Sequence, residues 1–230
     1  MSPRLDAILF DAGGVLVVPD PGAIGPVVRR FRADPTPEQI VRAHYAGMRA
    51  QDTEGAGHDD WHVYRVRMVE ATGVPSSLAE AAVEALMEVW SPYVWRFPLA
   101  VSVSGLHRLR LMGVPLGVVS NASGQIEGVL AAQGVCQVGP GAGVPVTVVV
   151  DSEVVGIMKP DPAIFTPAIE ALGLAPERIG YVGDSVRNDV RGAEAAGLVP
   201  LHLDPYDDHP DAPHERIRTL HDLTAMVTPA

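Results

Sequence analysis

Short runs of apolar residues alternate along the chain with segments of helical periodicity. The runs are rich in Val, Ile and Leu with little polar alternation, which is typical of strands covered on both faces; they span residues 5–10, 114–120, 144–150, 179–183 and 199–203. The helical segments have apolar residues three and four positions apart and a glycine just past each end; they span residues 103–112, 123–133, 163–172 and 186–196. This alternation predicts an α/β fold, a Rossmann-like, doubly wound parallel sheet with helices on both faces.

The stretch between the first and second predicted strands follows a different pattern. Residues 19–98 show helical periodicity without a convincing strand, and the clearest helices are expected at 36–49, 60–72 and 77–90. Prolines stand at both ends of this stretch, so two proline-bearing linkers are expected to join it to the rest of the chain. We therefore expect two domains: an α/β core domain of residues 1–18 and 99–230, and an inserted helical domain of residues 19–98.

The chain continues after the last predicted strand with a polar loop and a final helix. The loop, DPYDDHPDAPHE at 204–215, contains Asp and His residues that suggest a metal site, but its prolines interrupt any regular presentation of ligands. A solvated loop is therefore the preferred interpretation. The final helix is expected at 217–227.

Composition and charge narrow the classes of partner. The net charge of −11 provides no basic field for a nucleic acid or an anionic lipid surface. Cys136 is the single cysteine, which excludes an intramolecular disulfide and a cysteine-based zinc site. The first ten residues carry neither a signal-peptide pattern nor a membrane span, so a cytoplasmic protein is expected. Lys159 is the only lysine, so any chemistry that needs a side-chain amine must use it.

Polar residues directly follow several of the predicted strands. In open parallel sheets the ligand sites lie beyond the carboxyl ends of the strands, so these residues are candidates for one site. They are Asp11 after the first strand, Ser120 and Asn121 after the second, and Asp184, Ser185 and Asp189 after the fourth. Lys159 precedes a predicted helix nearby in the chain.

Three carboxylates at one edge of a sheet require a cation. They would repel one another, and the charge of one lysine is too small to neutralise them. Magnesium suits a site with carboxylates, water and substrate phosphate oxygens, and a carboxylate opposite it could attack phosphorus. The spacing thus fits a metal-binding phosphoryl-transfer site, although helix N-caps and a simple Lys-Pro-Asp turn explain the same residues equally well.

Four segments, in order, resemble the motifs of the haloacid dehalogenase (HAD) superfamily. They are FDAGGVL at 10–16, VVSNAS at 118–123, GIMKPDPAIF at 156–165 and GYVGDSVRNDVRGAEAAG at 180–197. The helical insert between the first two resembles the helical cap of subfamily I. The resemblance implies a HAD-like fold and a phosphatase-like hydrolase.

The resemblance also implies roles for the matching residues. Asp11 matches the covalent nucleophile that forms an aspartyl-phosphate, and Lys159 matches the cation that steadies the nucleophile and the phosphate. Ser120 matches the hydroxyl that binds a phosphoryl oxygen, with the backbone of Asn121 beside it. The implied cofactor is Mg²⁺, held by Asp11, Gly13, Asp184 and Asp189, with Asp184 as a direct ligand and Asp189 in support.

Gly13 departs from the pattern of phosphatases in this superfamily. The residue two positions after the nucleophile is usually a second Asp, which protonates the leaving group and later activates water. Glycine still offers its backbone carbonyl to magnesium but supplies no acid or base, and a positioned acid/base contributes roughly two to four orders of magnitude in rate. Turnover of ordinary phosphomonoesters is therefore expected to be slow unless the cap, a metal-bound water or a good leaving group substitutes for the missing acid/base.

Other activities of the superfamily fit the sequence less well. Phosphonate-cleaving relatives also lack the second Asp but use a cap lysine, and the insert contains no lysine. Haloacid dehalogenases work without magnesium, whereas GDSVRND retains two carboxylates, so dehalogenation is a minor alternative. A non-hydrolytic protein that uses the fold to bind a phosphorylated ligand or a protein partner stays open.

The expected substrate is a small phosphorylated metabolite, with no nucleic-acid or membrane partner. Sugar phosphates, nucleotides and small organic phosphates are equally compatible with the motifs, and nothing in the sequence indicates an oligomeric state. Residues that contact the substrate should lie in the cap, where the segment GHDDWHVYR at 57–65 contains His62 and Arg65. The simpler interpretation of this segment is a helix start that packs inside the bundle.

Overall fold

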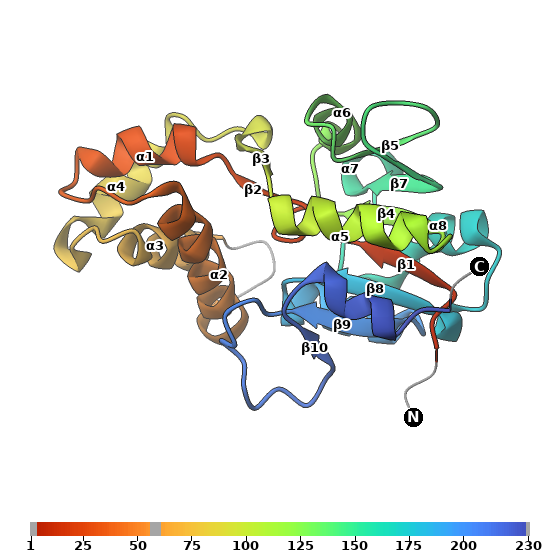
Figure 1. Ribbon diagram of the computed structural model, residues 1–230. Coiled ribbons are helices and arrows are strands. Elements are labelled where there is room, and N and C mark those ends of the chain that lie inside the picture. Colours follow the sequence, from red (N-terminus) through yellow and green to blue (C-terminus); the bar gives the residue numbers. More distant parts are fainter. Residues whose placement is uncertain (1–3, 56–60, 229–230) are drawn as a thin grey trace. The chain divides into compact units, whose positions relative to one another are not determined.

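The computed structural model describes residues 4–55 and 61–228. The chain divides into two compact units, the sheet unit (residues 1–17 and 98–230) and the helical unit (residues 18–97). The chain passes from one unit to the other in two short strands that pair with each other, β2 (Val17–Pro19) and β3 (Trp95–Pro98) (Figure 1). The sequence pattern did not predict these strands.

The sheet unit is built on six parallel strands. Their order across the sheet is β10 (Arg216–Ile217), β9 (Val199–Leu203), β8 (Ile179–Gly183), β1 (Ala7–Phe10), β4 (Leu116–Ser120) and β7 (Val148–Asp151). Phe10 at the end of β1 pairs with Val118 of β4 and with Val182 of β8. The direction in which successive strands are added reverses between β1 and β8, which confirms the doubly wound α/β prediction and places a topological switch point there.

Helices and short helical turns connect the strands of the sheet unit or, in the case of the last one, follow the final strand. They are α5 (Ala100–Leu111), α6 (Ile126–Ala132), α7 (Ser152–Val155), η2 (Pro162–Phe165), α8 (Thr166–Leu172), η3 (Pro176–Arg178), η4 (Val186–Val190), α9 (Arg191–Ala195) and η5 (Leu220–Ala225). The connection predicted at 186–196 is a π turn, η4, that continues as α9, so the helix is present but begins irregularly.

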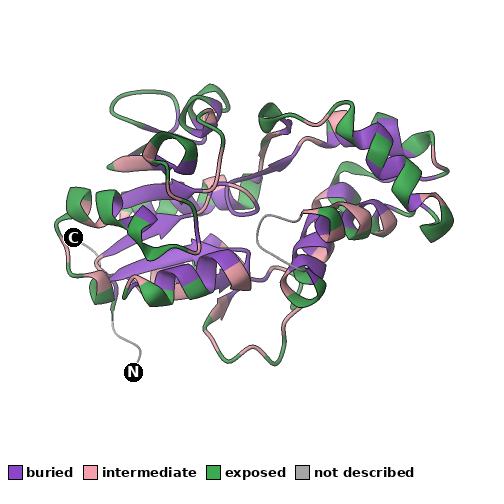
Figure 2. Ribbon diagram, turned by 180° about the vertical axis from the view of Figure 1, so that it is seen from behind, coloured by how far each residue is buried: buried purple, intermediate pink, exposed green. Residues whose placement is uncertain are grey.

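Two apolar cores lie on opposite faces of the sheet. Ile8 and Phe10 of β1 belong to the core that also contains Leu106 of α5, whereas Ala7 and Leu9 belong to the core that contains Phe165. Neighbouring residues of a strand point to opposite faces, so β1 contributes to both cores. Figure 2 shows the strands buried and the helices with exposed outer faces. This arrangement explains why the strands read as continuous apolar runs.

Two predicted elements of the sheet unit differ from the structure. Residues 144–150 form two strands: β6 (Val144–Val146) pairs with β5 (Cys136–Val138), and only β7 joins the main sheet. Pro145 lacks the N–H that a central strand would donate. The helix predicted at 217–227 is wrong: Ile217 pairs with β9, only the 3₁₀ helix η5 follows, and Val227 returns to pair with Leu5.

The helical unit contains α1 (Pro21–Arg29), α2 (Pro37–Glu54), α3 (His62–Ala71), α4 (Ser76–Met87) and the short turn η1 (Pro92–Val94). A capping box between Thr36 and Gln39 starts α2. A separate apolar core, which includes Ile24, Met68 and Leu86, holds these helices together. The first residues of the 57–65 segment lie outside the described residues.

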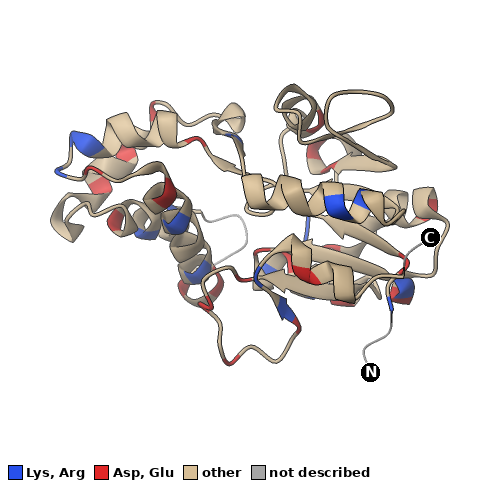
Figure 3. Ribbon diagram, viewed as in Figure 1, with Lys and Arg blue, Asp and Glu red and all other residues tan. Residues whose placement is uncertain are grey.

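Charged residues of both signs are interspersed on both units (Figure 3). Among the residues that the structure describes, no helix combines the length and the apolar character needed to cross a membrane.

The close approach of α5 to η5 gives a stability prediction. A Cβ at Gly105 would lie 2.5 Å from Leu220 Cβ and 3.2 Å from the Leu220 carbonyl carbon. We expect Gly105→Ala to lower the free energy of unfolding by about 1–3 kcal/mol, because backbone at this contact cannot move aside. Chemical denaturation measures the change.

Gly128→Ala is the matched control for Gly105→Ala. Gly128 is an exposed residue of α6, and a Cβ there meets nothing within 4 Å. The control should therefore be stabilised by about 0.5–1 kcal/mol, the usual gain of Ala over Gly in a helix. Equal stability of the two variants would show that α5 and η5 are not in tight contact.

Candidate active site

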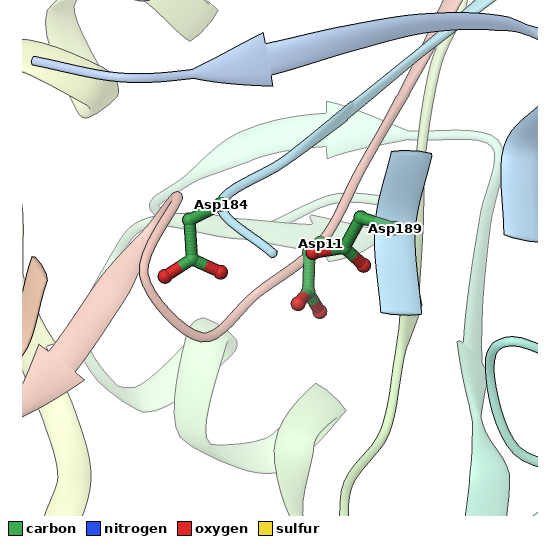
Figure 4. Close-up of side chains that lie close together, drawn as sticks. All are labelled: Asp11, Asp184 and Asp189. Atoms are coloured by element: carbon green, nitrogen blue, oxygen red, sulfur yellow. The ribbon is translucent and has the colours of Figure 1, made fainter. Parts of the chain in front are cut away.

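Three carboxylates meet at the carboxyl edge of the sheet, beside the switch point. Asp11 directly follows β1, Asp184 directly follows the neighbouring β8, and Asp189 lies in the π turn η4 (Figure 4). Each residue offers one carboxylate oxygen to a group whose oxygens all lie within 4.8 Å of one another. The three aspartates singled out in the sequence are thus brought together because the ends of adjacent parallel strands share one edge.

The loop after β8 depends on a close approach between its two ends. The Asp189 carboxylate accepts a hydrogen bond from the Ser185 backbone N–H at 3.0 Å, and Ser185 Oγ accepts one from the Asn188 N–H at 3.1 Å. A Cβ on Gly183 would overlap the Asp189 side chain, so glycine is required at the end of β8. These contacts hold the Asp189 side chain against the start of the loop that carries Asp184.

Lys159 lies within this carboxylate group, with only 1% of its side chain exposed. Its Nζ lies 2.6 Å from Asp189 Oδ1, 3.0 Å from Asp11 Oδ2 and 2.8 Å from the Tyr181 hydroxyl oxygen. An ammonium group has three donors, and all three have a partner here. Burial acts to lower the pKa of Lys159, but the charges of Asp11 and Asp189 outweigh it and raise that pKa.

Tyr181 is a component of the site that the sequence pattern did not indicate. Its hydroxyl donates to the Val119 carbonyl at 2.9 Å, one residue before Ser120, and accepts from Lys159. Burial and the Asp189 charge raise the pKa of Tyr181 well above its usual value, so the hydroxyl stays protonated. Tyr181 therefore connects β4 to the lysine. A single aromatic residue in the aliphatic run IGYVG was the available signal.

Asn121 holds the segment that carries Lys159. Its Oδ1 accepts from the Lys159 backbone N–H at 2.8 Å, and its Nδ2 donates to the Lys159 carbonyl at 3.0 Å. The side chain of Asn121 is therefore committed to positioning the lysine. The group of Asn121 that is expected to bind a phosphoryl oxygen is therefore its backbone N–H.

The loop after Ser120 is held by the end of β7, a support that the sequence pattern did not indicate. The Asp151 carboxylate accepts from the backbone N–H of Gly124 at 2.9 Å and of Ile126 at 3.3 Å. Ser152 Oγ and the backbone of Ala122 exchange two hydrogen bonds, both of 3.0 Å. Asp and Ser at a strand end are common as helix caps, which is why their role here was not apparent.

The surroundings of Asp11 favour its protonated form, so a further cation would help to keep this carboxyl group ionised. The pKa of Asp11 is raised to about 7, and burial is the largest cause. The charges of Asp189 and Asp184 also raise this pKa, whereas the charge of Lys159 and a hydrogen bond from the Ser120 side chain lower it. A divalent ion would favour the ionised form. The donor set therefore fits a hard cation with oxygen ligands.

Two neighbouring groups bear on this fit. Asn188, which precedes Asp189 in η4, has a buried Oδ1 with no hydrogen-bond partner among the described residues. Both oxygens of Asp189 are already engaged, by Lys159 on one side and by Ser185 on the other. This supports the expected division in which Asp184 binds a metal directly and Asp189 assists.

The remaining candidate residues lie elsewhere. Gly13 is in the turn after Asp11 and forms a bridge with Val17. His62 and Arg65 belong to α3 of the helical unit, where exposed His62 Nε2 lies 3.2 Å from Glu80 Oε1. Arg65 Nε is buried there without a hydrogen-bond partner among the described residues.

The raised pKa of Asp11 predicts how metal binding depends on pH. We expect the affinity for Mg²⁺ or Mn²⁺ to be nearly constant above about pH 7 and to fall by up to about tenfold per pH unit below it, because the metal must displace a proton. Isothermal titration calorimetry in two buffers of different ionisation enthalpy measures the affinity and the proton release. An affinity unchanged between about pH 6 and about pH 8 would contradict the prediction.

Two known phosphatases are similar to this chain in sequence. Phosphoserine phosphatase from Thermus thermophilus is 35% identical over 143 residues, which cover 62% of this chain and 53% of that enzyme. Glyceraldehyde 3-phosphate phosphatase from Methanopyrus kandleri is 32% identical over 179 residues, covering 74% of this chain and 73% of that enzyme. The match thus spans about half of the Thermus enzyme and nearly three quarters of the Methanopyrus enzyme.

Solved structures and a family profile extend the comparison over most of the chain. The crystal structure of a HAD phosphatase from Thermococcus onnurineus has a TM-score of 0.58 and 22% identity, covering 98% of this chain and 99% of that chain, which is a likeness of fold. The profile described as haloacid dehalogenase-like hydrolase matches residues 5–197. The resemblance carried by the four motifs is therefore confirmed, and the chain belongs to the haloacid dehalogenase-like hydrolases, as an enzyme of that family.

Proposed function

We propose that this enzyme is a magnesium-dependent phosphatase that hydrolyses small phosphomonoesters through an aspartyl-phosphate on Asp11. The observation that carries the proposal is the position of the Asp11 carboxylate, 3.0 Å from the buried Lys159 ammonium and grouped with Asp184 and Asp189. A nucleophilic carboxylate needs to be ionised and held: the Lys159 charge holds Asp11 and favours its ionised form, and a cation bound by the carboxylate group would favour that form further.

In the first half-reaction an Asp11 carboxylate oxygen attacks the phosphorus atom. A bond forms between that oxygen and phosphorus, and the bond from phosphorus to the ester oxygen breaks, leaving its electron pair on the alcohol oxygen. The Lys159 ammonium keeps Asp11 oriented through its contact with Oδ2. The Ser120 hydroxyl and the Asn121 backbone N–H bind the oxygens of the transferring group.

In the second half-reaction water attacks the phosphorus of the aspartyl-phosphate. The bond between Asp11 and phosphorus breaks, its electron pair returns to the carboxylate, and inorganic phosphate is released. The attacking water loses one proton, and this balances the proton that the alcohol leaving group gained in the first half-reaction. Gly13 supplies no side chain for either transfer, so solvent water carries both protons and turnover is slow.

Magnesium would be held by Asp11 and Asp184, with the Gly13 carbonyl as a further ligand and Asp189 in support. When bound it neutralises charge on the phosphoryl oxygens. The ionised form of Asp11 is the one that both the metal and the attack on phosphorus require.

A small phosphorylated metabolite is the proposed substrate class. The two named relatives are phosphatases of phosphoserine and of glyceraldehyde 3-phosphate, and both of these compounds are small phosphomonoesters. His62 and Arg65 of the helical unit are the proposed substrate contacts, because they can present charge or hydrogen-bond donors to the part of the substrate beyond the phosphate.

The alternatives have less support. Dehalogenation needs no metal-binding acidic group, yet Asp184 and Asp189 are both retained and are buried beside Asp11. A protein that only bound a phosphorylated ligand would not require the network that fixes Lys159 on Asp11.

Replacing the nucleophile tests the proposed function. We expect Asp11→Asn to reduce magnesium-stimulated phosphate release by at least about 10³-fold across a panel of phosphomonoesters, because an amide oxygen does not form the intermediate. Asp211→Asn, a change of the same kind at an exposed loop residue, should leave release unchanged. Equal release by wild type and Asp11→Asn would refute the proposal.

The absence of an acid/base side chain at Gly13 can be tested by substitution. Gly13 is not among the residues with positive φ, so its backbone conformation is one that residues with a side chain also adopt. We expect Gly13→Asp to raise kcat by about 10-fold or more on substrates with poor leaving groups, and less on aryl phosphates, because the new carboxyl group can protonate the alcohol. A uniform loss of kcat with both kinds of substrate would indicate that the missing acid does not limit turnover.

A further inference from the structure

The Tyr181 side chain reaches from β8 past β1 to the end of β4. In the sheet Tyr181 pairs with Leu9 of β1, and Leu9 pairs with Gly117 of β4. The Tyr181 hydroxyl nevertheless donates to the carbonyl of Val119, which lies two residues closer to the carboxyl edge than Gly117, at 2.9 Å. The length of a tyrosine side chain thus brings one oxygen atom to the edge at which the carboxylates meet.

Packing alone does not account for this hydroxyl. Tyr181 is 1% exposed, and its ring lies edge-on to that of Phe165, with the centroids 4.8 Å apart and the planes at 79°. A phenylalanine ring at position 181 would make the same contact, since this contact involves only the two rings. Burial of a hydroxyl costs free energy unless it is hydrogen-bonded, so the role of this oxygen follows from its polar contacts.

The Tyr181 hydroxyl is the uncharged one of the three partners of the Lys159 ammonium. Lys159 Nζ lies 2.6 Å from Asp189 Oδ1 and 3.0 Å from Asp11 Oδ2, so the nearer carboxylate is not that of the proposed nucleophile. The hydroxyl oxygen accepts the remaining donor at 2.8 Å. This third contact opposes a shift of Nζ away from Asp11.

The proton of the Tyr181 hydroxyl gives these contacts a direction. An ammonium group only donates, so the hydroxyl oxygen accepts from Lys159 and its own proton goes to another acceptor. The Val119 carbonyl at 2.9 Å is nearer than Asp189 Oδ1 at 3.2 Å, which already accepts from Lys159. The hydrogen bonds therefore run from Lys159 through Tyr181 to the residue that precedes Ser120. One oxygen atom thus links the lysine to the strand that carries the other phosphoryl-binding group.

We propose that Tyr181 is a positioning residue of the proposed phosphatase, which holds the Lys159 ammonium against the Asp11 carboxylate. This inference rests on the proposed function, because it assigns Tyr181 an effect on the reaction of Asp11. Without the hydroxyl, one donor of a buried ammonium lacks a partner, which is costly, and Nζ moves toward Asp189. Asp11 then loses part of the contact that orients it for attack.

The single lysine of the chain makes this contact directly measurable. Protein made with lysine labelled with ¹⁵N at Nζ gives one ammonium signal in nuclear magnetic resonance, since Lys159 is the only lysine. Tyr181→Phe removes the oxygen and keeps the ring. We expect its ammonium signal to shift and the ammonium protons to exchange with water at least about 10-fold faster than in wild type, because one donor no longer has a partner.

Steady-state kinetics provides the second measurement. With Mg²⁺ and a phosphomonoester, Tyr181→Phe is expected to lower kcat by about 10- to 100-fold and to leave KM within about threefold of the wild-type value. The displaced ammonium changes the orientation of the reacting carboxylate, whereas the groups that bind the rest of the substrate are unchanged. A loss of stability alone would not give this division between kcat and KM.

Two control variants separate positioning from stability. Leu198→Ala removes packing from the apolar core that contains Tyr181, and Tyr93→Phe removes the hydroxyl of an exposed tyrosine. Both should keep the wild-type ammonium signal and kcat, and circular dichroism verifies the fold of each variant.

Two outcomes would overturn the proposal: an unchanged ammonium signal in folded Tyr181→Phe, or a kcat equal to that of active wild type. Absence of phosphate release by wild type would instead refute the proposed function. The ammonium signal is measured without substrate, so it would still decide whether Tyr181 holds Lys159 in place.

Discussion

The buried ammonium of Lys159 is the contact on which the rest of the site depends. Taking one charge out of water costs several kcal/mol, and this is offset only when every donor finds a partner. Here Asp11, Asp189 and the Tyr181 hydroxyl satisfy the three donors of Lys159. The same cation keeps two carboxylates together that would otherwise repel. Because this is the only lysine of the chain, no second amine can take its place.

The sheet places the groups that surround this ammonium. β1 lies between β4 and β8, so Asp11 lies between the strand that ends at Ser120 and the strand that precedes Asp184. Asn121 holds the backbone of Lys159, and Tyr181 connects the ammonium to β4. The carboxylate of Asp11, the proposed nucleophile, is thus fixed by contacts between segments far apart in the chain, which is the preorganisation that transition-state stabilisation needs.

Most of the candidate site could be predicted from the sequence, but one of its components and the division of one strand could not. Asp11, Ser120, Lys159, Asp184 and Asp189 were predictable, because they follow apolar runs or lie in recognisable motifs, and the ends of parallel strands share an edge. Spacing alone left helix caps and turns as an equal explanation, and the family motifs added the roles. Tyr181 was not predictable, because its partner Lys159 is 22 residues away, nor was the division of residues 144–150 between two sheets. Periodicity indicates a strand but not the sheet that it joins.

Trapping of the covalent intermediate tests the account most directly. The protein is mixed with a rapidly cleaved phosphomonoester and Mg²⁺, quenched in acid, digested and measured by mass spectrometry. The peptide containing Asp11 is expected to gain the mass of one phosphoryl group, and this gain should disappear as the substrate is exhausted. A phosphoryl group on a different residue, or sustained phosphate release with no modified peptide at any quench time, would contradict it.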